Sequence, residues 1–483
     1  PHIAGTLSAS TDEATWVLTS YLVSNAIVLP ATNWLSSFFG RKQLLITCIT
    51  IFTLSSALCG AATSLGMLIA ARVIQGVGGG VLQPISQAVL LESFPHEKRG
   101  QAMAVYAMGI IVAPIIGPTL GGWITDNYSW RWIFYINVPF GILAIMMVQA
   151  FVENPPYLRQ AVRKNIDYIG LGLMAVGLGT LQLILDKGQQ EDWFESSWII
   201  WLTVLSVTAI IAFIIRELRA KEPIVDLRVL RNRNFGVGVL LMTMVGGVLY
   251  ATIAQLPLFL QTLMGYPALQ SGLALSPRGI GSMISMIIVG RLVGLMDGRY
   301  LIAFGFGVLA LSTYMLSGIN LDIAISNVML PNIINGFAMG FIFIPMTTMA
   351  MSTLRRDQIG NATGIYSLMR NLGGSLGISI STTVLARGAQ VHQAMLVSHM
   401  TPYDAAFQER LHQMQSAFAS QAGAAQATEQ AYGVMYRMVV KQSSLLAFLD
   451  GFWILTLLCL LCIPLIFLFK NVKSKAGAEI AAH

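Results

Sequence analysis

Charged side chains are scarce in this sequence. Asp, Glu, Lys and Arg make up 11% of the 483 residues, whereas 55% are hydrophobic and the mean hydropathy is +0.68. In a soluble domain about a quarter of all residues are charged, so a soluble fold is excluded. Apolar runs of 18 to 25 residues recur along the chain, and each is long enough to cross the ~30 Å hydrocarbon core of a bilayer. Because these runs do not alternate with polar residues, a membrane β-barrel is also excluded. We expect an all-α polytopic membrane protein.

Cysteine is rare, and the residue patterns of catalytic and metal sites are lacking. The four cysteines, which we expect to be packing residues, are Cys48, Cys59, Cys459 and Cys462. The histidines at His392, His399 and His412 have no Cys or carboxylate companions, so we expect no metal site. The glycine-rich run 76–80 lacks the Lys-Ser/Thr of a phosphate-binding loop. We therefore expect no enzyme and no cofactor, with transport energy taken from an ion gradient or from the gradient of the substrate.

The basic residues are distributed unevenly. We expect membrane spans at 14–38, 43–63, 66–91, 100–122, 131–152, 166–185, 197–216, 236–262, 269–295, 300–318, 325–351, 359–386 and 447–469. Loops on one side of these spans hold 20 Lys and Arg, loops on the other side hold 6, and 3 lie inside spans. The positive-inside rule makes the first side cytoplasmic. The net charge of +7 therefore sets topology and does not indicate nucleic-acid binding.

The start of the chain affects the expected topology. Thirteen spans with a cytoplasmic C-terminus place the N-terminus outside, and the chain begins with Pro1 and has no signal peptide. Both observations are explained if one further span precedes residue 1. We expect a fragment of a fourteen-span protein whose first helix is missing.

The order of the spans predicts two six-helix halves with two inserted helices between them. Short cytoplasmic turns ending in glycine and basic residues occur at Gly40-Arg41-Lys42 and again at Gly298-Arg299, and repeated six-span units are common in secondary transporters. We expect an N-terminal half at 1–152, two inserted spans and a cytoplasmic linker at 153–235, a C-terminal half at 236–387, a periplasmic loop at 388–446, and the last span with a tail at 447–483. The loop contains a helix-compatible stretch from Phe407 to Phe418 and is either a solvated helical segment or a docking surface.

Charges inside the spans are candidates for proton coupling or gating, because burying them in hydrocarbon costs several kcal/mol. Arg72 lies deep in its span, with Gln75 one turn further on. We expect Arg72 to point into the bundle and to bond a neighbouring helix. Arg278 and Arg370 are further candidates, and a purely structural role is the alternative for each. Acidic residues are almost absent from the spans, so the proton-carrying acid is not identified.

Polar residues on otherwise apolar helices either line a transport pathway or form hydrogen bonds between helices. These candidates are Tyr21, Asn25, Gln83, Asn137, Gln255, Asn332 and Asn335. The 24 Met and 22 Phe residues suit an adaptable cavity for hydrophobic small molecules, although most of them must pack or face membrane lipid.

The run 113–122 combines prolines and glycines inside a span. Pro114 and Pro118 remove backbone hydrogen bonds, while Gly117, Gly121 and Gly122 remove side-chain bulk. We therefore expect this helix to bend and a neighbouring helix to approach it closely.

This run resembles the antiporter signature of the fifth span in drug-exporting major facilitator proteins. Together with the segments around 68–76 and 126–139, it makes the whole chain similar to the fourteen-span drug:proton antiporters, in particular to multidrug exporters of Gram-negative bacteria. The resemblance implies a major facilitator fold in the inner membrane and efflux of hydrophobic compounds with protons as the coupling ion. It also implies a periplasmic adaptor protein and an outer-membrane channel as partners. Asn33 and Ser37 depart from the Gly and Asp usual in the superfamily, which weakens a gating charge network at that turn.

Proton-driven efflux of hydrophobic drugs or toxic compounds is thus the leading functional hypothesis. The alternative is a solute importer or facilitator of the same fold, against which the run 113–122 argues. A membrane sensor without transport is disfavoured because no signalling domain is visible.

Overall fold

The computed structural model describes residues 2–9, 11–95, 98–153, 167–293, 295–401, 403–422 and 424–470. Within these ranges the chain is helical and forms no strand. The helices are α1 (His2–Thr6), α2 (Thr11–Val28), α3 (Thr32–Phe39), α4 (Arg41–Ala61), α5 (Leu65–Ser93), α6 (Arg99–Asn127), α7 (Trp132–Tyr135), α8 (Asn137–Phe151), α10 (Tyr168–Lys187), α11 (Ser197–Arg219), α12 (Arg233–Thr262), α13 (Ala268–Leu275), α14 (Pro277–Leu292), α15 (Gly298–Leu316), α16 (Ile325–Met351), α17 (Arg356–Ser398), α18 (Ala405–Ala422) and α19 (Ala424–Ile466), with short 3-10 turns η2 (Trp193–Glu195) and η3 (Leu227–Arg231).

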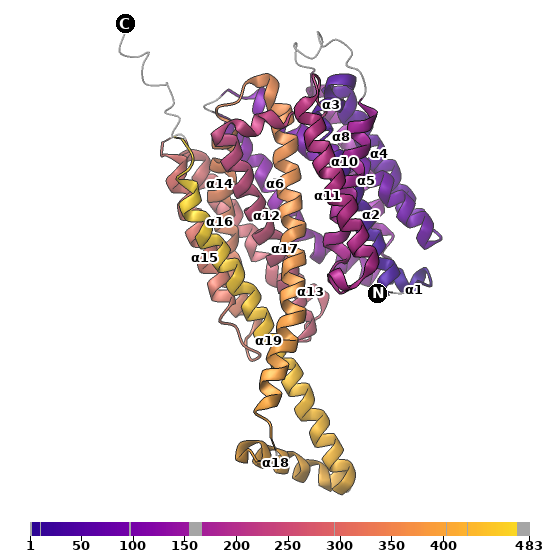
Figure 1. Cartoon of the computed structure of the whole chain (residues 1–483), viewed down its shortest axis with the longest axis vertical. Helices are drawn as coiled ribbons and strands as arrows, with labels where there is room; N and C mark the ends of the chain where they lie inside the picture. Colours follow the sequence, from indigo (N-terminus) through magenta and orange to yellow (C-terminus); the bar gives the residue numbers. More distant parts are fainter. Residues whose placement is uncertain are drawn as a thin grey trace.

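The prediction of an all-α polytopic membrane protein is confirmed. In the described ranges, ten helices are long and apolar enough to cross a membrane, or eleven if the bent pair α2–α3 counts as one span. The long helices α6 and α17 run alongside them (Figure 1). Each predicted span coincides with one of these helices or with a pair of helices separated by a short break.

The first predicted span, 14–38, is wrong in one respect because it is two helices. α2 ends at Val28 and α3 begins at Thr32, with a bend of 63° between them. Pro30 lies at this break, and proline cannot donate the backbone hydrogen bond that would continue a helix. The Thr32 hydroxyl donates to the carbonyl of Leu29 at 2.7 Å, which satisfies one of the carbonyls left free at the end of α2.

The predicted loop 388–446 is also corrected, because it is almost entirely helical where described. α17 and α19 are each 43 residues long, which corresponds to about 65 Å at 1.5 Å per residue, twice the thickness of the hydrocarbon core. They leave the bundle together and carry α18, which includes the predicted stretch 407–418, at the far end (Figure 1). We call residues 388–446 the stalk, and the end of the bundle from which it projects the stalk face. The opposite end, which bears the turn at Gly40-Arg41-Lys42, is the basic face.

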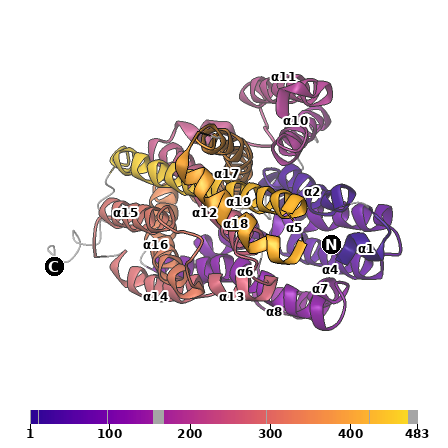
Figure 2. The same ribbon diagram turned by 90° about the horizontal axis from the view of Figure 1, so that it is seen from below.

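The helices form two groups that meet along two seams (Figure 2). One group contains α2, α3, α4, α5 and α8, and the other contains α12, α14, α15, α16, α17 and α19. α6 forms the first seam by packing against α13, α14 and α16, whereas α17 forms the second by packing against α3 and α5 as well as α12. α10 and α11 lie at the edge of the molecule beside α2 (Figure 2).

Glycines allow helices to touch backbone to backbone within each group. A Cβ placed on Gly336 of α16 would lie 1.8 Å from the carbonyl oxygen of Arg278 in α14, and one on Gly246 of α12 would lie 2.2 Å from that of Arg370 in α17. On the other side of the molecule, Gly76 of α5 approaches the carbonyl of Tyr21 in α2. Small residues give this close approach in membranes, where the lipid offers helices no hydrophobic force for association.

The expectation of close packing at 113–122 is wrong for the glycines of that run. Among the residues that the structure describes, a Cβ on Gly117 or Gly122 would meet nothing within 4 Å, and one on Gly121 would meet the Ile133 side chain at 3.9 Å. The run lies inside the continuous helix α6, and the side chains of Pro114 and Pro118 are outside the described residues. Close packing between helices therefore depends on glycines in other helices.

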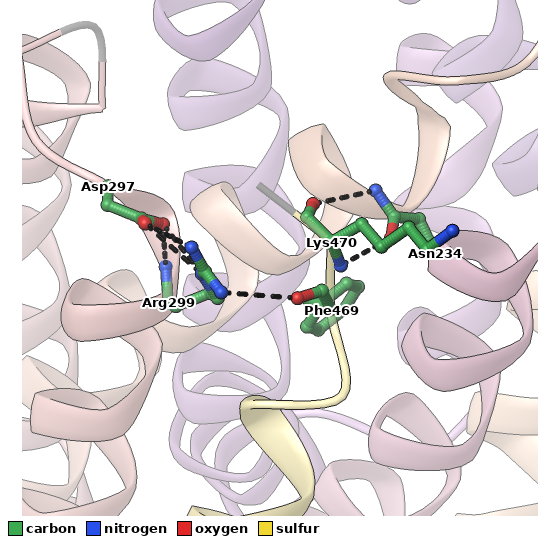
Figure 3. A network of polar contacts seen from close by, with 5 residues as sticks. All are labelled: Asn234, Asp297, Arg299, Phe469 and Lys470. Atoms are coloured by element: carbon green, nitrogen blue, oxygen red, sulfur yellow. Dashed lines mark hydrogen bonds and ion pairs between the residues drawn. The ribbon is translucent and has the colours of Figure 1, made fainter. Parts of the chain in front are cut away.

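A polar network fixes the end of α19 on the basic face (Figure 3). The Asn234 side chain donates to the Lys470 carbonyl at 3.2 Å and accepts from its amide at 2.8 Å. Arg299 donates to the Phe469 carbonyl at 3.4 Å and forms a 2.9 Å ion pair with Asp297. Burial raises the pKa of Asp297, but hydrogen bonds from Arg299 outweigh it, and the pKa lies below its usual value. This carboxylate therefore stays ionised and holds Arg299 in place.

We predict that Gly336→Ala destabilises the protein, because the added methyl group cannot fit against a backbone carbonyl. Overpacking of this kind costs about 1–3 kcal/mol, and the unfolding temperature of the purified protein in detergent should fall. Gly307→Ala is the matched control, since Gly307 is also helical but a Cβ there meets none of the described residues within 4 Å. Equal unfolding temperatures for the two variants would contradict the packing argument.

Candidate functional site

A cavity of about 520 Å³ lies between the two groups of helices. Its lining residues are Tyr21, Leu22, Asn25, Ala26, Gly79, Leu82, Gln83, Ser86, Tyr106, Ile110, Gln182, Tyr250, Asn371, Gly374, Ser375 and Ile378. None of these described residues is charged. Hydroxyl and amide groups alternate with aliphatic surface, so the cavity suits a compound that is mainly hydrophobic and carries a few hydrogen-bonding groups.

Three of the predicted pathway residues lie in this cavity. Tyr21 and Asn25 are on α2, one turn apart, and Gln83 is on α5 opposite them. The Tyr106 hydroxyl, from α6, donates to the Gln83 carbonyl at 2.9 Å. The structure therefore brings these three candidates together in one cavity at the second seam, which α6 also lines.

The other four pathway candidates lie outside this cavity, and three of them form hydrogen bonds with neighbouring helices. The Asn137 amide donates to Ser56 at 3.0 Å, the Gln255 amide donates to Ser381, and the Asn332 oxygen accepts from Arg278 at 3.0 Å. Asn335 is fully buried, and neither of its side-chain polar atoms has a partner in the described part of the chain. Asn137, Gln255 and Asn332 thus form hydrogen bonds between helices, which is the alternative to lining the pathway.

Sequence reasoning missed most of the polar cavity wall, including Ser86. Tyr106, Gln182, Tyr250, Asn371 and Ser375 line it but were not among the candidates. Gln182 and Tyr250 are lone polar residues in apolar runs, which is the signal that selected the other candidates. The helical face on which a residue lies decides whether it reaches the cavity, and only the packing of six helices settles that face.

Arg72 points into the bundle and bonds α2, as expected from its position. Its Nε donates to the carbonyl of Val17 at 2.9 Å, and its Nη1 donates to the Gln75 side chain at 2.7 Å. The guanidinium carbon lies 4.3 Å from the centre of the Tyr21 ring, a distance at which a cation attracts an aromatic face. Arg72 therefore connects α5 to a residue of the cavity wall and to the backbone of α2.

Arg278 and Arg370 are buried more completely and have fewer partners. Arg278 donates to Asn332, but its Nε and Nη1 have no partner in the described residues. The guanidinium carbon of Arg370 lies 5.7 Å from the centre of the Phe343 ring, and its Nε and Nη2 have no partner in those same ranges. Neither residue lines the cavity, although Arg370 directly precedes Asn371, which does.

The basic turn forms a buried ion pair. Gly40 adopts a positive φ of 78°, which lets the chain reverse between α3 and α4. Arg41 donates two hydrogen bonds to Glu92 of α5 at 2.5 and 2.8 Å, with the two side chains 3% and 10% exposed. Lys42 donates to the Gln149 carbonyl of α8 at 2.7 Å. Glu92 thus supplies this turn with a carboxylate, which Asn33 and Ser37 do not provide.

The two groups of helices are in contact at the basic face. A Cβ on Gly360 of α17 would lie 2.2 Å from the Asn33 side chain of α3. Next to this contact, Leu29 packs with Leu368 and Leu372 of α17 in a buried cluster. The described contacts thus close the cavity toward the basic face along the second seam.

At the base of the stalk, the structure corrects the expectation that the stalk histidines lack a carboxylate companion. The Nε2 atom of His392 in α17 lies 2.6 Å from a carboxylate oxygen of Asp450 in α19. The two residues are far apart in the sequence, and only the pairing of the long helices brings them together.

Comparisons with known proteins agree with this architecture. The model of the Major Facilitator Superfamily matches residues 1–378. The chain belongs to this superfamily. It is therefore a multi-pass membrane transporter rather than an enzyme, and the expected major facilitator fold is confirmed.

Members of the superfamily with similar sequences include multidrug exporters. The chain is 38% identical to multidrug export protein EmrB of Haemophilus influenzae, over 94% of this chain and 88% of that protein. It is 36% identical to fatty acid resistance protein FarB of Neisseria gonorrhoeae, over 99% of this chain and 92% of that protein. The crystal structure of the human organic anion transporter MFSD10 has the same fold, with a TM-score of 0.57, 14% identity and coverage of 92% and 83% of the two chains.

We predict that Glu92→Gln destabilises the transporter by about 3–5 kcal/mol, because it leaves the Arg41 charge buried without its carboxylate. The measurement is thermal or denaturant unfolding of the purified protein in detergent. Asp357→Asn is the control, since it breaks the Arg355–Asp357 pair, whose side chains are 74% and 58% exposed, and such exposed pairs contribute about 0–1 kcal/mol. A similar decrease in the free energy of unfolding in both variants would show that burial does not make the Arg41–Glu92 pair more important than an exposed pair.

Proposed function

We propose that this transporter exports hydrophobic drugs or other toxic compounds across the bacterial inner membrane in exchange for protons. We further propose that it works with a periplasmic adaptor protein and an outer-membrane channel. The basic face would be cytoplasmic, and the stalk would project into the periplasm.

The observation that carries the proposal is the uncharged cavity between the two helix groups. Its tyrosine, amide and hydroxyl groups are spaced along aliphatic walls from Leu22, Leu82 and Ile378. A site without fixed charge accepts varied apolar compounds by dispersion and a few adaptable hydrogen bonds. The relatives named for multidrug export and fatty acid resistance support export of such compounds rather than import of one polar solute.

Arg72 is the residue that we assign to coupling. It binds the α2 backbone and the Tyr21 ring at once, so a movement of α2 and a change at the cavity wall both act on the same guanidinium. A proton taken up nearby would compete with this cation for partners and shift its contacts. Arg72 would thereby link proton binding to the occupancy of the cavity.

The stalk is the part that we assign to the adaptor. Leu411, Ala431 and Met435 form a small buried core between α18 and α19, so the stalk has a defined shape. Its surface exposes apolar side chains, among them Val391, Met395, Tyr403, Tyr432 and Tyr436. Exposed apolar residues on a projecting segment are typical of protein–protein contacts.

We predict that Arg72→Ala reduces the initial rate of dye efflux at least tenfold while leaving membrane expression intact. In cells that carry the unsubstituted protein, a protonophore should abolish efflux, and a susceptibility panel should identify the exported compounds. Arg219→Ala is the control, because Arg219 ends α11 on the basic face, away from the cavity. Normal efflux by Arg72→Ala would remove the coupling role from this residue, and efflux that persists with the protonophore would exclude proton exchange.

We predict that deleting α18 abolishes resistance in cells that depend on the adaptor but preserves transport in proteoliposomes. A photo-cross-linker at Gln413, or at Gln408 on the same helix, should capture the adaptor. The same cross-linker at Tyr300 is the control, since this exposed residue lies at the basic end of α15. If the shortened protein confers full resistance and no cross-link forms, the stalk is only a spacer.

A further inference from the structure

The two inserted helices lie at the edge of the bundle, yet α10 contacts both halves. It packs along α2 on one side and reaches α17 on the other (Figure 2). α11 packs mainly against α10 and adds no comparable contact with the halves. α10 therefore covers the second seam, where α2 and α17 flank the cavity.

The contact between α10 and α2 is close-packed and carries charge. A Cβ on Gly179 of α10 would lie 3.2 Å from Ile27 and 3.6 Å from Val23. Nearer the stalk face, the Thr19 hydroxyl donates to the Asp186 carboxylate, and the Lys187 ammonium donates to Thr15 at 2.5 Å. Charged hydrogen bonds are stronger than neutral ones, and together with the close packing they hold α10 along several turns of α2.

The contact between α10 and α17 is made differently. Gln182 and Ser375 share hydrogen bonds of 2.8 and 3.0 Å. In the η2 turn that follows α10, the indole N–H of Trp193 is shared between Thr383 of α17 and Gln189, at 3.1 Å from each side-chain oxygen. These are neutral hydrogen bonds between single side chains. Gln182 and Ser375 also line the cavity, so this contact is part of the cavity wall.

The turn that places Trp193 is strained. Asp192 and Trp193 have φ values of 49° and 54°, in the left-handed region that residues with a side chain rarely adopt. The Trp193 ring lies against Gly188, where a Cβ would come within 2.7 Å of it. Two consecutive strained residues persist only where surrounding contacts hold them, and such strain occurs at moving or functional segments.

We propose that α10 moves with the N-terminal half, and that Gln182–Ser375 and Trp193–Thr383 form a latch that opens in each transport cycle. This inference rests on the proposed export function. When two halves rock about a central site, a helix that bridges them must separate from one. The neutral contact to α17 breaks more easily than the packed and charged contact to α2.

While closed, the latch excludes lipid from the cavity and places Gln182 beside the exported compound. Gln182 is therefore also a residue that we expect to influence substrate choice.

The test compares two cross-links in a variant that lacks the four native cysteines. Val23→Cys with Gly179→Cys joins α10 to α2, and Gln182→Cys with Ser375→Cys joins α10 to α17. After oxidation in proteoliposomes, we expect the first variant to keep at least half of its reduced transport rate. The second should fall below a tenth and recover on addition of reductant. Inhibition by both cross-links, by neither, or by the first alone would overturn the latch.

The reduced variants separate failure of the latch from failure of the proposed function. If the reduced and the unsubstituted proteins export nothing, export is wrong, and the latch is tested by distances instead. Spin labels at the exposed positions Val176 and Leu376 report the distance between α10 and α17, and labels at Val176 and Leu18 report the distance between α10 and α2. We expect two distance populations for the first pair and one for the second. A single population for α10–α17 under all conditions would refute the latch.

Discussion

Helices in a bilayer gain little from hiding apolar surface from lipid, so their association depends on how closely their backbones approach. In this transporter the approach occurs at glycines such as Gly76, Gly246 and Gly336, each against the backbone of a neighbouring helix. These contacts bind the helices of each group closely to one another. Because these contacts lie within the groups, the seams between them remain the places where the molecule can change shape and where a cavity can persist.

The scarcity of charge gives each buried ion a large structural role. Arg41 is neutralised by Glu92 and fixes the turn between α3 and α4, whereas the described surroundings of Arg72 are a backbone carbonyl, the Gln75 amide and the rings of Tyr21 and Phe134. The first arrangement is complete, and the second leaves a cation that responds to any new negative group nearby. This difference is the reason that we propose a coupling role for Arg72 and not for Arg41.

The sequence predicted the helical class, the spans and the family because continuous apolar runs and long motifs are local properties. It identified Tyr21, Asn25 and Gln83 in the cavity but not Tyr106 or Gln182, because a polar residue in an apolar run does not reveal which face it occupies. The break at Pro30 and the stalk helices depend on local signals that hydropathy smooths out. The pairing of Arg41 with Glu92, like that of His392 with Asp450, depends on tertiary contacts between distant segments.

The continuity of α17 has a mechanical consequence. The same helix contributes Asn371 and Ser375 to the cavity wall and runs on to Ser398 in the stalk. A rigid rod of 43 residues spans about 65 Å, so a tilt of about 10° would displace its far end by roughly 11 Å. A small tilt of α17 at the cavity would therefore become a displacement of several ångströms in the stalk, beyond the membrane, where a partner protein could bind.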